Sequence, residues 1–168
     1  MNFEYAAAPE SRSVVKIDPE YGHFINGKWV NGSSHFNSIN PATEEVLSRI
    51  ALGTAADVDA AVKAARNAFD KSWSKLSGRE RGKYLFRIAR IMQERAREFA
   101  VLETLDNGKP IRESRDVDVP LSAAHFFYHA GWADKLEYAG IESTTAPHGV
   151  VGQIIPWNFP LLMLAWKV

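Results

Sequence analysis

The residues with the clearest chemical potential lie in the segment GVVGQIIPWNFPLLMLAWKV, residues 149–168. Asn158 stands there between two aromatic residues, each followed or preceded by a proline. A side-chain amide is a neutral hydrogen-bond donor, and such a donor can stabilise negative charge that develops on an oxygen. The same residue type also caps turns by bonding to nearby backbone. The residue types alone leave both interpretations of Asn158 open.

Other kinds of reactive group are scarce in this sequence. It contains no cysteine, so it supplies no thiol nucleophile, disulfide or thiolate metal ligand. His125 and His129 lie four residues apart, a helical spacing that can place two imidazoles on one metal ion. Phe-Phe-Tyr separates them, without the glutamate of a zinc protease, and no third ligand follows at a recognisable spacing. We therefore expect no metal site and two partly exposed histidines.

Composition bounds the class of protein and its partners. The chain has 168 residues, of which 46% are hydrophobic, enough for the core of one domain. Twenty basic residues balance twenty acidic ones without long blocks of either sign, which argues against nucleic acid as a partner. Residues 1–20 lack the basic and apolar regions of a secretory signal. They predict a flexible N-terminal tail and a cytoplasmic protein.

The final twenty residues are long and apolar enough to raise the possibility of a membrane span. Gln153, Pro156, Asn158 and Pro160 fall within that stretch, and polar or helix-breaking residues are costly in lipid. We expect no membrane contact. Residues 149–156 form a nearly continuous apolar run, typical of a strand covered on both faces in a parallel sheet. A buried helix is expected from Pro160 onward.

The elements before this segment follow from local signals. Asn26-Gly27 predicts a tight hairpin with a type I′ turn, and the alternation over residues 46–51 predicts a further strand. Thr54 and Asp57 form a capping-box pattern at the start of a helix. One face of that helix is expected to be buried, and it carries Val58, Ala61, Val62, Ala65 and Phe69.

Two longer helical patterns follow. One runs from about Arg79 to Asn107-Gly108, with Pro110 just beyond its end. Its expected apolar side carries Leu85, Ile88, Met92, Phe99 and Leu102. The next helix is expected to open at Asp116, Asp118 and Pro120. Its expected buried stripe consists of Leu121, Ala124, Tyr128, Trp132 and Leu136.

Seven segments of this chain, in this order, resemble the aldehyde dehydrogenase superfamily: FINGKWV, INPATEEVL, AVKAARNAF, SGRERGKYLFRIARIM, LETLDNGKP, HAGWADK and GVVGQIIPWNFPLLMLAWK. The resemblance covers residues 21–168 and concerns the N-terminal part of that fold. It implies an α/β protein with a β-hairpin and strands, then several helices. The last part would be the first strand and helix of an incomplete Rossmann-like parallel sheet, without the catalytic domain.

Members of this family oxidise aldehydes to carboxylic acids with NAD or NADP, using a cysteine nucleophile and a glutamate base. This chain has no cysteine and no acidic residue after Glu142. We therefore expect it to be inactive by itself and to bind no cofactor tightly. Expected partners are the aldehyde substrate, the remainder of the enzyme or a second copy of the chain. The alternative is a non-catalytic stub, a subunit-pairing module or a dinucleotide-binding module.

The resemblance also assigns roles to individual residues. Asn158 matches the donor to the oxyanion, and Lys167 matches a lysine near the active site. Ile154, Ile155, Pro156 and Trp157 match a segment that holds the cofactor, largely through backbone. Phe159, Leu162, Met163 and Trp166 match positions that line the substrate tunnel. The apolar positions are equally compatible with ordinary core packing.

Overall fold

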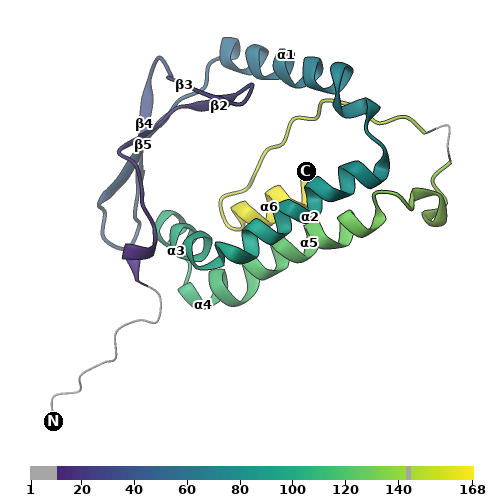
Figure 1. Ribbon diagram of the computed structural model, residues 1–168. Helices are drawn as coiled ribbons and strands as arrows, with labels where there is room; N and C mark the ends of the chain where they lie inside the picture. Colours follow the sequence, from purple (N-terminus) through teal and green to yellow (C-terminus); the bar gives the residue numbers. More distant parts are fainter. Residues whose placement is uncertain (1–10, 143–144) are drawn as a thin grey trace.

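The structure is a computed structural model that describes residues 11–142 and 145–168 (Figure 1). Its strands are β1 (Glu20–Tyr21), β2 (His23–Ile25), β3 (Lys28–Val30), β4 (His35–Ile39) and β5 (Val46–Ala51). Its α-helices are α1 (Ala55–Lys71), α2 (Gly78–Glu94), α3 (Ala96–Asn107), α4 (Ile111–Glu113), α5 (Val119–Trp132) and α6 (Pro160–Lys167). Short 3₁₀ turns are η1 (Arg12–Val14), η2 (Trp73–Lys75) and η4 (Leu136–Ala139), and η3 (Ser114–Asp118) is a π-helical turn.

The strands form two small sheets. β5 lies between β1 and β4, parallel to the first and antiparallel to the second, which confirms the strand over residues 46–51. β2 and β3 form the predicted hairpin, with Asn26 and Gly27 both at positive φ as a type I′ turn requires. β1 begins at Glu20, so ordered structure starts inside the predicted tail. Residues 1–10 of that tail lie outside the described residues.

Helix α1 begins as predicted but packs differently. The Thr54 hydroxyl accepts the Asp57 backbone N–H, and the Asp57 carboxylate accepts the Thr54 N–H, which completes the capping box. The prediction of a buried apolar face is wrong, because no α1 residue is buried. Val58 is 58% exposed. The described elements that α1 contacts most are η2 and β2, and Figure 1 shows α1 at the edge of the molecule, apart from the α2, α5 and α6 helices.

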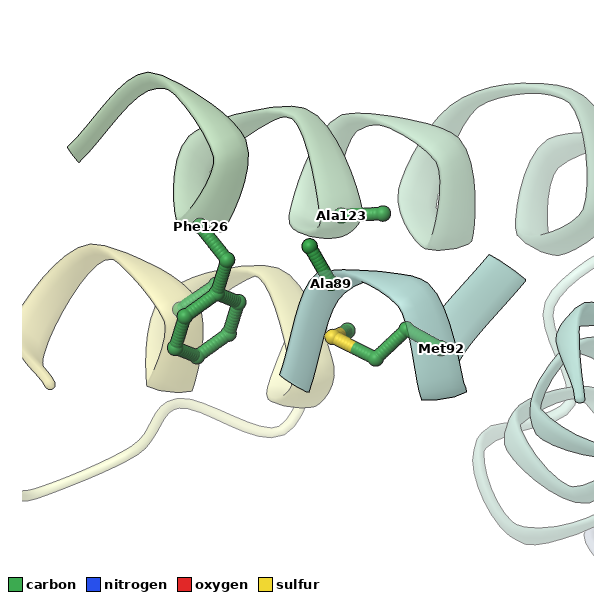
Figure 2. Close-up of a cluster of buried hydrophobic side chains, with 5 residues drawn as sticks. Ala89, Met92, Ala123 and Phe126 are labelled. Carbon is green, nitrogen blue, oxygen red and sulfur yellow. The ribbon is translucent and has the colours of Figure 1, made fainter. Parts of the chain in front are cut away.

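The long helix predicted from Arg79 is two helices. The backbone leaves helical geometry at Arg95, which separates α2 from α3. A compact core forms where α2, α5 and α6 meet, built from Ala89, Met92, Ala123, Phe126 and Ala165 (Figure 2). The alanines allow the helices to approach closely, and the Phe126 ring fills the space beside α6. Of the predicted side of this helix, Met92 is buried, whereas Ile88 and Leu102 are exposed.

The buried face of α5 is not the predicted one. Ser122, Ala123 and Phe126 are buried, whereas Leu121 and Tyr128 of the predicted stripe are exposed. α5 is apolar around most of its circumference, so its hydrophobic pattern does not select one face. The predicted opening of this helix is confirmed, because Asp118 is the N-cap residue of α5 and Pro120 lies in its first turn, although the Asp118 side chain makes no capping hydrogen bond. Asp118 ends the π-helical turn η3 and is itself buried.

The strand predicted over residues 149–156 is wrong as well. This segment has no regular secondary structure, and Ile154 is 91% exposed. A strand needs a hydrogen-bonded neighbour, and none of the described strands pairs with this segment. The following helix is confirmed as α6, which buries Leu162 and Ala165. No helix among the described residues is long and apolar enough to cross a membrane.

These exposed apolar surfaces predict the solution behaviour of the 168-residue chain by itself. Large hydrophobic side chains that include Ile154, Trp157 and Val58 face solvent, and contiguous apolar surface promotes association. We expect the purified chain to bind the dye ANS and to show a sedimentation coefficient that rises with concentration. A chain that stays monomeric, binds no dye and melts in one sharp transition would contradict this expectation.

Candidate functional site

The segment Pro-Trp-Asn-Phe-Pro forms the entry to helix α6. Phe159 is the N-cap residue and Pro160 occupies the first turn, where its missing N–H is not needed. The Phe159 carbonyl accepts the Met163 N–H at 2.8 Å, which is the first bond of the helix. Asn158 therefore lies just outside the helix, with an exposed side chain. Such a position leaves its amide able to meet another molecule.

The residues predicted to hold the cofactor lie in an extended coil. Ile154, Pro156 and Trp157 are exposed, Trp157 by 85%, while Ile155 is half-buried. The Lys167 ammonium donates to the Ile154 carbonyl at 2.6 Å. This bond connects the last turn of α6 to the coil that precedes it, so Lys167 acts here as a local anchor.

The residues predicted to line a substrate tunnel do not share one environment. Leu162 is buried, whereas Met163 is half-buried. The Trp166 indole N–H donates to Nε2 of His125 at 2.6 Å, and the ring is 55% exposed. Phe159 lies on the opposite side of the helix entry, over the Lys109 ammonium. Their common tunnel stays a prediction.

A cavity of about 460 Å³ lies between the strands and the α3 and α6 helices. Its walls are mainly apolar and include Ile50, Phe99, Ile155 and Leu164. Of the predicted site residues, only Ile155 lines this cavity. Asn158 does not line this cavity.

The C-terminal end of helix α3 restrains the turn formed by residues 157–159. Nδ2 of Asn107 lies 2.7 Å from the Trp157 carbonyl oxygen and 3.4 Å from the Asn158 carbonyl oxygen, and it donates to both. The Lys109 ammonium lies 3.8 Å from the centre of the Phe159 ring, in cation–π geometry. Two residues of the segment Asp-Asn-Gly-Lys-Pro thus contact three consecutive residues of the turn.

Gly108 makes this double contact possible. It terminates α3 with φ +78°, and a Cβ atom there would come within 2.6 Å of Pro41. Glycine adopts this left-handed conformation without strain. The chain therefore reverses direction between Asn107 and Lys109, and both side chains reach the same turn.

Lys109 is also the centre of a buried ionic cluster. Its ammonium pairs with the Asp118 carboxylate and with Oε1 of Glu103, the latter at 3.4 Å. Glu103 and Asp118 are 7% and 1% exposed. Their remaining oxygens, Oε2 of Glu103 and Oδ1 of Asp118, have no hydrogen-bond donor in the described part of the chain. Two buried carboxylates thus share one cation.

This arrangement changes the protonation of Glu103. Burial, followed by the hydrogen bond and charge of the neighbouring Asp118, raises its pKa to about 7, and Lys109 opposes the shift. A proton held between the two carboxyl groups would neutralise the cluster and satisfy the oxygens that lack donors. No role was predicted from the sequence for Glu103 or Lys109, and Asp118 was expected only at the opening of a helix.

His125 and His129 lie on α5 with stacked rings whose centres are 6.4 Å apart. Nε2 of His125 faces the Trp166 indole rather than an open position. Among the residues that the structure describes, no three histidine or acidic side chains gather closely enough to hold a metal ion.

Comparison with known proteins identifies the family. The model of the aldehyde dehydrogenase family matches residues 29–168. The chain belongs to the aldehyde dehydrogenase family. It is 46% identical over 155 residues to aldehyde dehydrogenase family 2 member B4 of Arabidopsis thaliana, which covers 86% of this chain and 29% of that protein. It is 41% identical over 174 residues to the acetaldehyde dehydrogenase of Pseudomonas aeruginosa, which covers 98% of this chain and 34% of that protein.

Solved structures agree with these sequence relationships. The NAD⁺ complex of an aldehyde dehydrogenase from Bacillus cereus superposes with a TM-score of 0.80 at 39% identity, over 90% of this chain and 33% of that one. The chain therefore has the fold of the N-terminal portion of an aldehyde dehydrogenase, and it spans about a third of the length of the relatives it matches. The resemblance stated from its motifs is confirmed.

The ionic cluster predicts a pH dependence. Glu103 binds its proton more tightly in the folded protein than at the ordinary glutamate pKa of 4.5. Its stabilising contribution is therefore present below about pH 4.5 and is lost as the pH rises to about 7. We expect carboxyl ¹³C NMR to show one glutamate titrating near pH 7, and Lys109→Met to move that titration to higher pH.

The matched control for this titration is Lys63→Met, which removes an exposed lysine from α1. It should leave the glutamate near pH 7 unchanged. If Glu103 instead titrates near pH 4.5 in the unaltered chain, the two carboxyl groups are not competing for charge, and the account of the cluster is wrong.

Proposed function

We propose that this chain supplies the oxyanion-stabilising amide and part of the cofactor-binding region of an NAD(P)-dependent aldehyde dehydrogenase, which oxidises an aldehyde to a carboxylic acid. The observation that carries the proposal is the exposed Asn158 side chain at the entry of α6. Its turn accepts a hydrogen bond from Asn107, the last residue of α3, and its Phe159 ring lies on the Lys109 ammonium. Family membership over residues 29–168 supports it.

The proposed chemistry of Asn158 follows from its amide. When a nucleophile adds to the aldehyde carbon, the carbonyl oxygen gains negative charge, and a fixed N–H donor lowers the energy of that state. A neutral amide keeps its donor at every physiological pH. The chain has no cysteine, so we propose that the thiol nucleophile and the glutamate base come from outside these 168 residues. By itself the chain would then not oxidise aldehydes.

The coil at residues 154–157 fits a dinucleotide held mainly by backbone and apolar contact. The exposed Ile154 and Trp157 side chains offer apolar surface, and Lys167 and Asn107 fix the backbone by bonding to carbonyls of this coil. The bound NAD or NADP would accept the two electrons that leave the aldehyde. The path of the substrate would be bordered by Phe159, Leu162, Met163 and Trp166. The proposed reaction uses no metal ion.

We further propose that residues 149–156 become the first strand of a Rossmann-like sheet once neighbouring strands from the rest of the enzyme are present. A second copy of the chain or that remainder would cover the apolar surfaces of α1 and the coil. The balanced charge makes nucleic acid an unsuitable partner. We propose a cytoplasmic location for the protein.

One alternative is that the chain belongs to the same family but has no catalytic role. A module that only pairs with full-length dehydrogenase subunits would also expose apolar surface, as Val58 and Trp157 do. The two functions differ in their dependence on Asn158. Pairing depends on apolar contact area, whereas oxyanion stabilisation depends on one amide group.

A chimera tests the proposal. This chain would replace the matched third of the Pseudomonas aeruginosa acetaldehyde dehydrogenase, and NADH formation from acetaldehyde would be followed. We expect an active enzyme whose kcat falls about a hundredfold in Asn158→Ala, the usual loss for one oxyanion donor. Asn31→Ala, at an exposed position after β3, is the control and should retain full activity.

Two results would count against the catalytic role. One is a well-folded chimera that forms no NADH from acetaldehyde. The other is an active chimera whose Asn158→Ala variant keeps its kcat. The 168-residue chain assayed by itself should form no NADH, because it brings no thiol to the reaction.

A further inference from the structure

We propose that Asn107 and Lys109 are positioning residues that orient Asn158 from outside the reacting groups. This inference rests on the proposed function for its catalytic meaning, but the contacts themselves belong to the described structure. It gives the segment Asp-Asn-Gly-Lys-Pro a task beyond ending a helix.

Asn107 holds the two peptide planes on either side of Asn158. The Trp157 carbonyl belongs to the plane that leads into residue 158, and the Asn158 carbonyl belongs to the plane that leaves it. Nδ2 of Asn107 donates to both oxygens, at 2.7 and 3.4 Å. Fixing both planes fixes φ and ψ of residue 158, and these angles set the direction of its Cα–Cβ bond. Asn107 thereby aims the Asn158 side chain.

The Phe159 ring restrains the part of the turn that leads into α6. The Phe159 ring lies on the Lys109 ammonium at 3.8 Å, and the attraction between a cation and a ring face restrains the ring. Lys109 cannot move freely because Asp118 and Glu103 hold its ammonium in a buried site. The turn is thus fixed to a charge that is itself fixed to two helices.

The part of the turn before Phe159 has few other restraining contacts. Trp157 is 85% exposed, and residues 149–156 pair with no described strand. Phe159 is bound to α6 through the Met163 N–H, but that bond restrains only the helix side. Asn107 therefore supplies the hydrogen bonds that hold the Trp157 and Asn158 carbonyls.

Limited proteolysis of the 168-residue chain tests the positioning directly. Chymotrypsin cleaves after aromatic residues, so cleavage after Trp157 reports opening of the turn, and cleavage after the exposed Tyr138 reports the remainder of the chain. We expect Asn107→Ala to raise the ratio of the Trp157 to the Tyr138 cleavage rate about fivefold, the value of one ordinary hydrogen bond. Asn31→Ala should leave this ratio unchanged.

Lysine variants separate the ring contact from general stability. Lys109→Arg keeps a cation for both the ring and the carboxylates, and it should keep the ratio within about twofold of the original. Lys109→Met leaves two buried carboxyl groups without their cation and should raise the ratio. If Lys109→Met raises both cleavage rates equally, the lysine only stabilises the fold, and its positioning role is overturned.

Kinetics in the chimera give the catalytic readout. We expect Asn107→Ala to lower kcat about tenfold while the KM for acetaldehyde stays within about twofold, because misorientation of a donor affects the reacting state more than binding. An unchanged cleavage ratio in Asn107→Ala would overturn the positioning inference. An inactive chimera with an altered ratio would overturn the proposed function instead, so the two failures are distinguishable.

Discussion

The buried ammonium of Lys109 is the constraint on which the other contacts at this end of the molecule depend. A buried charge is stable only when oppositely charged or polar groups surround it. Glu103 comes from α3, Asp118 from the turn before α5, and Phe159 from the entry to α6. The contacts of this one ammonium therefore fix the positions of α3, the start of α5 and the entry to α6 relative to one another.

This constraint explains how an irregular segment can keep a defined shape. Residues 154–159 have no strand partner among the described elements, yet their carbonyls are bound by Asn107 and Lys167. Polar side chains at helix ends thus supply hydrogen bonds that a neighbouring strand would supply in a sheet. The core of Ala89, Ala123 and Phe126 is a separate source of order, and it positions the helices from which these side chains extend.

The sequence predicted features whose cause lies within a few residues. The Asn26-Gly27 turn, the Thr54 capping box and the end of α3 at Gly108 depend on local backbone geometry and local hydrogen bonds. The faces of α1 and α5 and the strand over residues 149–156 could not be predicted in the same way, because burial and strand pairing depend on which element lies beside them.

The candidate site was predicted only in part for a similar reason. Asn158 stood out through its motif, but Asn107 and Lys109 did not, because the helix-ending role of Gly108 and Pro110 explained their segment. A signal was present. Glu103 directly follows the apolar run from Phe99 to Leu102 in α3 and is buried, and a carboxylate at such a position needs a buried partner. A search for that partner would have led to Lys109.

The central claim is that Asn107 acts on the reaction through Asn158, and a double-mutant cycle in the chimeric dehydrogenase tests it most directly. If the claim is right, Asn107→Ala lowers kcat when Asn158 is present and has no further effect in Asn158→Ala, where no amide remains to be aimed. Full additivity of the two losses would contradict it, because Asn107 would then act by a route that does not involve Asn158.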